Sequence, residues 1–336
     1  MNSLRIALPD DFHAHLRQGP PLRAYVARSA ANFGRFLAMP NVVPPPVDGR
    51  SLADYGAALA SAIAGSGRDA RVLLSFKLVP GMGPEAVYRC AEAGAVAGKY
   101  YPAGATTHSS DGIAEPGQVS RELAAMQEAG LVLAVHGEDP AAPVLGRETA
   151  FLPVLDRVVA AYPRLRVVLE HLSGAEAVAA VLDWPDRVAA TITAHHLAYT
   201  IDDLLGERLD PSFYCKPLLK SAADRSALVE AACSGSPKFF FGSDSAPHPA
   251  AAKAAGAAGV YASPAAMPIL AAVFEEAGAL DRLEGFCSAA GARFYGLPEP
   301  RGELLLERRE WVVPGELDGV VPLAAGRTLS WTAYRT

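Results

Sequence analysis

Short apolar runs recur along the chain and alternate with longer stretches in which apolar and polar residues are mixed. The short runs are apolar throughout, which is typical of parallel strands that are covered on both faces. The predicted strands are Leu4–Leu8, Arg35–Met39, Val72–Leu78, Ala95–Tyr100, Leu131–Val135, Arg166–Leu169, Ala189–Thr193 and Phe239–Gly242.

Most of the longer stretches have the periodicity of helices. The predicted helices are Leu52–Ala64, Pro84–Ala93, Gly117–Ala129, Val154–Ala161, Ala175–Leu182, Ser221–Cys233, Pro264–Ala277 and Leu280–Ala290. Strands that alternate with helices favour a (β/α)8 barrel, the α/β fold of the TIM type. A doubly wound sheet is the competing arrangement, but no Gly-x-Gly-x-x-Gly follows the first predicted strand.

The chain has 336 residues, and α/β barrels commonly run to about 250 residues or more as one unit. We therefore expect one barrel domain over residues 1–336. The tail Leu304–Thr336 has short apolar stretches and few helix signals, so we expect it to pack outside the barrel.

Composition disfavours nucleic-acid-binding, membrane-spanning and disulfide-rich proteins. Hydrophobic residues make up 51% of the chain, which is enough for a large core, and the net charge of −6 disfavours a nucleic-acid partner. No apolar run is long enough to span a membrane, and the chain reaches Pro9 and Asp10 before a signal segment could form. The four cysteines show no Cys-x-x-Cys spacing, which fits a reducing cytoplasm.

Histidines and one aspartate follow the predicted strands, where a barrel builds its site. His13 and His15 follow the first strand, His136 the fifth, His171 the sixth and Asp244 the eighth. The His-x-His spacing directs both imidazoles to one side of an extended segment, a natural chelate for zinc or a similar divalent ion. Such a pair alone is a weak signal, but the whole set predicts a metal centre.

Lys99 lies near the end of an apolar run. A buried ammonium without a partner is costly. Two interpretations stay open: a barrel lysine paired with a carboxylate, or an amine converted by carbon dioxide to a carbamate, whose two oxygens could bridge two metal ions.

Two further polar residues suit a substrate that carries a carboxylate. Arg17 lies two residues beyond the His-x-His pair, and its planar guanidinium matches a carboxylate. Asn41 could donate to the same group. A structural salt bridge is the alternative for Arg17, and a turn residue after Pro40 is the alternative for Asn41.

Taken together, these segments resemble the dihydroorotases of the shorter single-enzyme type, within the metal-dependent amidohydrolase superfamily. The resemblance runs from Asp10 to about Gly296. The matching segments are 11–17 (DFHAHLR), 39–41 (MPN), 99–102 (KYYP) with 105–107 (ATT), 135–138 (VHGE), 170–171 (EH), 191–193 (TIT) with 196–197 (HL), 214–217 (YCKP) and 242–248 (GSDSAPH).

The resemblance implies a (β/α)8 barrel with two zinc ions per subunit. The implied ligands are His13, His15 and Asp244 for one ion and His136 and His171 for the other, with N6-carboxylated Lys99 and a hydroxide as bridges. The implied reaction is the reversible, zinc-dependent cyclisation of N-carbamoyl-L-aspartate to L-dihydroorotate plus water, in de novo pyrimidine biosynthesis.

The resemblance also implies roles for substrate-facing residues. Asp244 would move the proton between water and the ring nitrogen. The implied contacts are Arg17, Asn41 and His248 for the substrate carboxylate, and backbone groups near Lys216 and Ala258 for the ring amides. Thr106 and Thr107 match a mobile loop that closes over the substrate, extended here by His108, Ser109 and Ser110. His195 is expected to be structural or exposed, and His196 to support the site from behind.

Three other readings remain. A hydantoinase, dihydropyrimidinase or allantoinase would share the metal residues, but Arg17, Asn41 and His248 favour a substrate with a carboxylate. A non-catalytic scaffold should have lost at least one ligand, and a nucleic-acid-binding module is disfavoured by the net charge. We expect a small-molecule substrate, no membrane partner, a cytoplasmic location and a possible homodimer whose interface the sequence does not locate.

Overall fold

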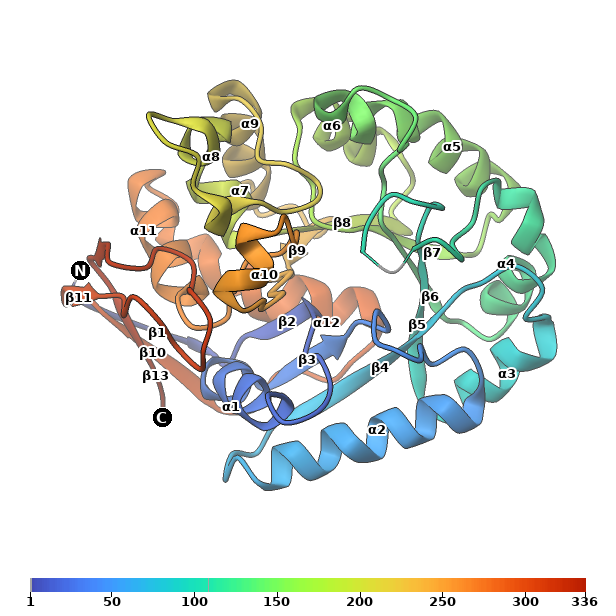
Figure 1. Cartoon of the computed structure of the whole chain (residues 1–336), viewed down its shortest axis with the longest axis horizontal. Coiled ribbons are helices and arrows are strands. Elements are labelled where there is room, and N and C mark those ends of the chain that lie inside the picture. Colours follow the sequence, from blue (N-terminus) through green and yellow to red (C-terminus); the bar gives the residue numbers. More distant parts are fainter. Residues whose placement is uncertain (1, 108) are drawn as a thin grey trace.

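The computed structural model describes residues 2–107 and 109–336, so His108 lies outside the described residues. Eight parallel strands form one sheet in sequential order from β2 to β9 (Figure 1). Their bounds are Asp10–Ala14 (β2), Arg35–Ala38 (β3), Arg71–Lys77 (β4), Ala95–Tyr100 (β5), Val132–Val135 (β6), Arg166–Leu169 (β7), Val188–Ile192 (β8) and Phe239–Phe241 (β9). A parallel bridge between Ala14 and Ser245 joins the end of β2 to the segment after β9. The sheet is therefore a nearly closed barrel, as predicted.

Helices surround this sheet (Figure 1). The longer ones are α1 (Leu22–Asn32), α2 (Gly49–Ala64), α3 (Pro84–Glu92), α4 (Ser120–Glu128), α5 (Arg147–Ala161), α6 (Ala175–Asp183), α9 (Ala222–Cys233) and α11 (Ala266–Glu276). Shorter ones are α7 (Ala194–Ala198), α8 (Ile201–Leu205), α10 (Ala250–Ala254) and α12 (Ala290–Tyr295). The predicted helix Leu280–Ala290 is instead a 3-10 turn, Leu280–Arg282, followed by a π-helical turn, Gly285–Ala289.

Local sequence fixes several helix starts. Asp48 accepts a hydrogen bond from the backbone N–H of Ser51 at the start of α2, and the Ser51 hydroxyl caps in return. Ser221 and Asp224 form the same reciprocal arrangement at α9. Each such pair satisfies backbone donors that have no partner inside the helix.

The first predicted strand, Leu4–Leu8, is a strand, but it does not belong to the barrel. Residues Ser3–Ala7 (β1) pair antiparallel with Glu303–Glu307 (β10), which pairs with Thr332–Arg335 (β13) in a separate three-stranded sheet. Trp311–Val312 (β11) and Thr328–Leu329 (β12) form a second small sheet. The described part of 304–336 therefore contributes no strand to the barrel. In Figure 1 these strands lie beside the barrel, near both ends of the chain.

The true first barrel strand is polar in sequence yet buried at every position. Asp10 binds the Arg35 guanidinium through two hydrogen bonds, at 2.8 and 2.5 Å. Asp11 accepts hydrogen bonds from the backbone N–H and the hydroxyl of Ser243, at 2.7 and 2.6 Å. Buried charges persist when they are paired in this way, so an apolar pattern could not reveal this strand.

Aromatic rings fill the barrel interior. Phe12 stacks on Tyr295 with ring centroids 4.8 Å apart and meets the edge of Phe240 at 5.3 Å. A Cβ atom at Gly291 would lie 2.3 Å from the Phe12 ring, so only glycine lets α12 approach this closely. The two ends of the barrel therefore differ. Helix α12 covers one end, and the carboxyl ends of the strands lie at the other.

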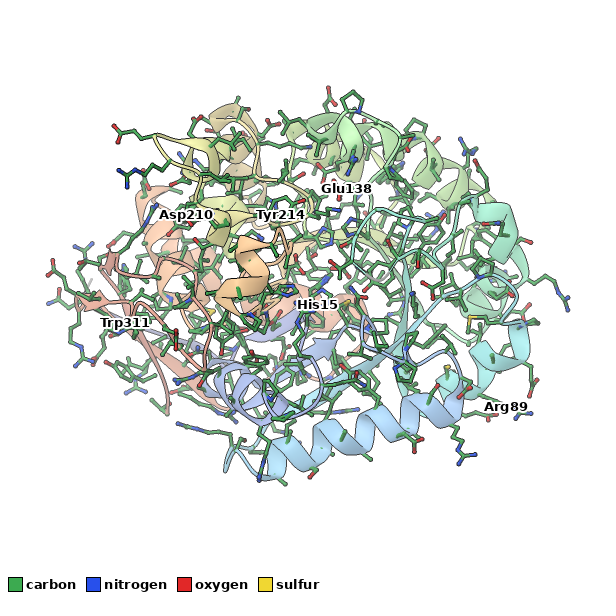
Figure 2. All side chains as sticks on the ribbon, in the orientation of Figure 1. His15, Arg89, Glu138, Asp210, Tyr214 and Trp311 are labelled. Atoms are coloured by element: carbon green, nitrogen blue, oxygen red, sulfur yellow. The ribbon has the colours of Figure 1, made fainter. Side chains whose placement is uncertain are left out.

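Around the barrel, side chains have contrasting environments. Figure 2 shows His15 near the centre of the molecule, inside the ring of helices, and Arg89 of α3 at the periphery. Among the described residues, no helix is both long and apolar enough to cross a membrane.

Truncating the central ring tests this packing. Phe12→Ala removes a side chain that is 1% exposed, so we expect a loss of about 3–5 kcal/mol in the free energy of unfolding, measured by urea denaturation. Phe12→Leu should cost clearly less. A loss below about 1 kcal/mol for Phe12→Ala would mean that the ring does not support the barrel.

Candidate active site

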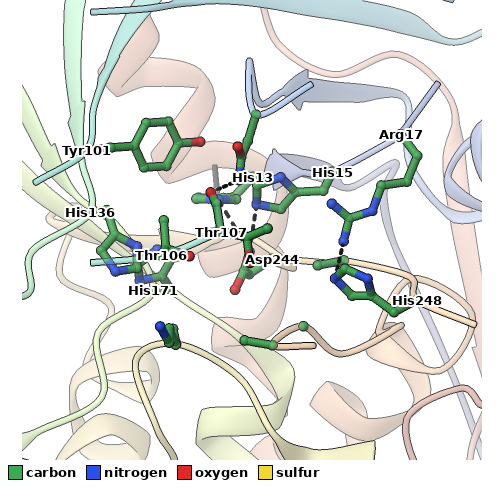
Figure 3. A pocket seen from close by; sticks show the side chains of 15 residues that line it. His13, His15, Arg17, Tyr101, Thr106, Thr107, His136, His171, Asp244 and His248 are labelled. Atoms are coloured by element: carbon green, nitrogen blue, oxygen red, sulfur yellow. Dashed lines mark hydrogen bonds and ion pairs between the residues drawn. The ribbon is translucent and has the colours of Figure 1, made fainter. Parts of the chain in front are cut away.

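One cavity at the carboxyl ends of the barrel strands collects almost every side chain that the sequence singled out (Figure 3). Its empty volume is about 420 Å³, including its open mouth. The lining residues are His13, His15, Arg17, Asn41, Tyr101, Thr106, Thr107, His136, His171, Lys216, Asp244, Ala246, His248, Ala258 and Gly259. Lys99 is the one predicted site residue outside this lining.

Asp244 meets the two histidines that follow β2. Its Oδ1 atom lies 3.1 Å from His15 Nε2 and 3.4 Å from His13 Nε2. Potential ligand atoms of these three residues all lie within 4.8 Å of one another. Burial alone would raise the pKa of Asp244, but the hydrogen bond from His15 and the charges of the nearby histidines outweigh it and hold the pKa well below its usual value. The carboxylate is therefore ionised at neutral pH.

His136 and His171 form the other half of the cluster, with ring centroids 4.8 Å apart. His136 Nε2 lies 2.8 Å from Glu138 Oε2. His171 Nδ1 is buried and has no hydrogen-bond partner among the described residues. Burial and the neighbouring His136 push the pKa of His171 well below its usual value, so its imidazole is neutral and its lone pair is available.

Lys99 is fully buried on β5, and its Nζ atom has no hydrogen-bond partner in the described part of the chain. Burial lowers the pKa of the amine to about 8. The expected alternative, a lysine hydrogen-bonded to a carboxylate, is not formed among these residues. The amine thus has the accessible neutral form that a reaction with carbon dioxide requires.

Behind the histidines lie carboxylates to which the sequence analysis gave no role. Glu170 Oε2 lies 2.8 Å from His13 Nδ1 and accepts the Thr191 hydroxyl at 2.7 Å. Burial alone would raise the pKa of Glu170, but the charges of His13 and Lys99 and these hydrogen bonds lower it. A carboxylate at Nδ1 fixes the His13 ring so that Nε2 faces the cavity. The available signal was position, since Glu170 directly precedes His171 and Glu138 follows His136 by two residues.

Backbone strain concentrates here. Arg17, His171 and Asp244 have φ values of 60°, 46° and 43°, three of the five positive values among the described non-glycine residues. Such conformations cost free energy and persist where the surroundings enforce them. At each of these positions the turn directs a polar side chain into the cavity.

Arg17 and His248 lie together opposite the histidine cluster (Figure 3). Arg17 Nη2 lies 2.8 Å from His248 Nε2, and Arg17 Nε donates to the Pro247 carbonyl at 3.0 Å. No ion pair joins Arg17 to a carboxylate within the described residues, so the structural salt bridge that we considered is not found. Burial lowers the pKa of Arg17, although the group stays charged.

The loop that carries Thr106 and Thr107 lies against the cavity. Asn41 Nδ2 donates to the Thr107 carbonyl at 3.0 Å, and Lys216 Nζ donates to the Ala105 carbonyl at 3.2 Å. Ser109 Oγ donates to the Thr106 carbonyl at 2.6 Å. The loop is therefore held inward by contacts with the barrel rim.

A second group of potential metal ligands, His195, His196 and Cys215, lies apart from the cavity lining. His196 is already engaged, with Nδ1 2.8 Å from Thr193 Oγ1 and Nε2 3.2 Å from the Pro217 carbonyl. The Cys215 thiol donates to the same carbonyl at 3.1 Å. These contacts favour a structural role. His195 is fully buried, in agreement with the structural rather than the exposed expectation.

Comparison with known proteins identifies the family. No family model matches the chain. A dihydroorotase from Teredinibacter turnerae is 43% identical over 343 residues, covering 99% of both chains.

Solved structures agree with this relationship. Dihydroorotase from Saccharomyces cerevisiae, solved with 5-fluoroorotic acid, superposes with a TM-score of 0.92 at 35% identity and covers 100% of this chain and 99% of that one. Dihydroorotase from Campylobacter jejuni gives 0.91 at 32% identity, covering 99% and 97%. An L-hydantoinase from Arthrobacter aurescens gives 0.85 at 18% identity, covering 99% and 84%, and this likeness concerns the fold alone. The chain belongs to the dihydroorotase family.

Proposed function

We propose that this cavity converts N-carbamoyl-L-aspartate to L-dihydroorotate plus water, and back, with two zinc ions, as a step of de novo pyrimidine biosynthesis. The observation that carries the proposal is the division of one cavity into two chemically distinct halves. Imidazoles, Asp244 and Lys99 gather on one side, and the Arg17–His248 pair stands on the other.

The donor set fits two divalent ions. His13, His15 and Asp244 would hold one ion, His136 and His171 the other, and a carboxylated Lys99 would bridge them. His15 Nδ1, His171 Nδ1 and Lys99 Nζ are buried polar atoms without hydrogen-bond partners among the described residues, and such atoms are costly unless a ligand satisfies them. When bound, two such ions lower the pKa of a water molecule and polarise a carbonyl oxygen.

Asp244 is the proposed proton carrier. In the hydrolytic direction its ionised carboxylate accepts a proton from the attacking water. The same proton then passes to the ring nitrogen as the carbon–nitrogen bond breaks. In cyclisation each transfer runs backwards. The strongly depressed pKa of Asp244 keeps the acceptor form available at neutral pH before substrate enters.

Arg17, Asn41 and His248 are proposed to hold the substrate carboxylate. A guanidinium binds a carboxylate more strongly than a neutral acceptor, and dihydroorotate carries a carboxylate whereas an uncharged hydantoin does not. This difference argues against the other cyclic amidases. Backbone groups at Lys216 and Ala258 are proposed to contact the ring amides, and Thr106 and Thr107 to exclude water when the loop is closed.

The wider setting also remains proposed. We propose a small-molecule substrate and no nucleic-acid or membrane partner, and the net charge of −6 supports the part that concerns nucleic acid. A cytoplasmic location and a two-fold homodimer are predictions that gel filtration and localisation experiments address.

The first test separates the two halves of the cavity. In a dihydroorotate hydrolysis assay with zinc and bicarbonate, Asp244→Asn should lose at least about a thousandfold in kcat. Arg17→Ala should lose roughly a hundredfold in kcat/KM, chiefly through KM. Arg28→Ala is the matched control, because Arg28 pairs with Asp318 on the surface. An enzyme that opens hydantoins but leaves dihydroorotate intact would contradict the proposed binding of a substrate carboxylate by Arg17.

Lys99 carboxylation has its own test. Metal-free protein incubated with 13C-bicarbonate and zinc should show one carbamate resonance, which Lys99→Gln abolishes and Lys77→Met retains. The neutral amine reacts, and its pKa is about 8, so the initial rate at fixed carbon dioxide should rise with pH up to about 8 and then level off. A signal that survives Lys99→Gln would assign the carbamate elsewhere.

Glu170 should strengthen zinc binding by orienting His13. Glu170→Gln removes the ionised acceptor at His13 Nδ1, and we expect zinc to bind roughly 10–100-fold more weakly in competition with a chelator. Glu122→Gln is the control. The buried Glu122 carboxylate accepts a hydrogen bond from the Gly83 N–H, which lies outside the cavity. Equal affinity in wild type and Glu170→Gln would contradict the orienting role.

A further inference from the structure

The loop over residues 102–112 is bound to the barrel rim at its inner and outer sides. On the inner side, Asn41 and Lys216 donate to backbone carbonyls of the loop, as described above. On the outer side, the Lys77 ammonium forms an ion pair with the Asp111 carboxylate. The inner contacts use neutral carbonyl acceptors, whereas the outer contact joins two opposite charges.

Lys77 is an unusual place for a charge. It is the last residue of β4 and only 2% exposed, and its register partner on β5 is Lys99. The Nζ atoms of Lys77 and Lys99 lie 6.0 and 5.5 Å from the centre of the same Tyr101 ring. Asp111 places a carboxylate beside the buried Lys77 amine.

The two partners have unequal access to water. The Asp111 side chain is 54% exposed, so water can solvate its carboxylate when the loop moves away. The Lys77 side chain stays in the barrel rim, so opening the loop would break its ion pair with Asp111. Removing one partner from a buried charge costs far more than an exposed pair contributes. The penalty for opening the loop therefore falls on Lys77 and favours the closed position.

We propose that Lys77 and Asp111 form an electrostatic latch that sets how much of the time the loop with Thr106 and Thr107 is closed. Both are positioning residues, since neither lines the cavity. The inference rests on the proposed role of the two threonines in covering the substrate. If the closed loop is the state that binds ligand, the apparent affinity is proportional to the fraction of molecules in which the loop is closed. Breaking the ion pair should therefore weaken ligand binding.

The test measures affinity and turnover in the zinc-loaded enzyme. The probe is 5-fluoroorotic acid, the ligand in the Saccharomyces cerevisiae structure. Asp111→Asn should weaken its binding and lower kcat/KM for dihydroorotate by about tenfold each, the scale of one hydrogen bond between charged groups. Lys77→Met should act in the same direction. The double variant should be no worse than Lys77→Met, because the partners act as one unit.

Controls separate the latch from general destabilisation and from the proposed function. Asp318→Asn breaks an ion pair with Arg28 outside the loop, whose cation is exposed rather than buried, and should leave both constants within about twofold of wild type. Unchanged probe affinity in Asp111→Asn, or purely additive losses in the double variant, would overturn the latch. Full activity in Thr107→Ala would instead remove the role of the threonines, and inactivity of wild type would remove the proposed function. Asp111→Asn alters an exposed side chain, so this test does not depend on the folding of Lys77→Met.

Discussion

The structure depends on neutralising charges that a closed parallel barrel buries at one end. The strands bring polar side chains to a common rim, and the packed interior below leaves no water to solvate them. Carboxylates therefore contact two of the imidazoles: Glu170 contacts His13 and Glu138 contacts His136. A third carboxylate, Asp11, accepts a hydrogen bond from the Ser243 hydroxyl. Each of these contacts fixes a ring or a turn, and together they leave the remaining nitrogen lone pairs facing one cavity.

This arrangement also explains why strain collects at the same end. Asp244 follows β9 directly, and at φ 43° its carboxylate meets both His13 and His15. The neighbouring Ser243 is held by Asp11, whose backbone belongs to β2. The buried Asp11 carboxylate thus holds the turn that carries Asp244. The strain of the turn is offset by hydrogen bonds that form only when the first and last barrel strands meet.

The sequence was sufficient for the barrel and for most of the cavity, because both depend on local order along the chain. Apolar runs predict strands wherever the strand faces a dry core, and residues that follow such runs must share one rim. The same logic failed at Asp10–Ala14, where an ion pair and hydrogen bonds accompany the burial of polar side chains. It also assigned Leu4–Leu8 to the barrel, although β1 pairs with the tail. Contacts between distant segments, such as Glu170 with His13 or Lys77 with Asp111, leave no periodic signal.

The two rim lysines show how context decides chemistry for one residue type. Lys77 and Lys99 are register partners on adjacent strands, equally buried and near one aromatic ring. Lys77 forms an ion pair with a carboxylate from the loop. Lys99 lacks such a hydrogen-bonded partner among the described residues, and burial lowers its pKa to about 8. The two lysines therefore differ in their contacts rather than in their burial: the loop supplies Lys77 with an ion-pair partner, whereas the Lys99 amine has a lowered pKa.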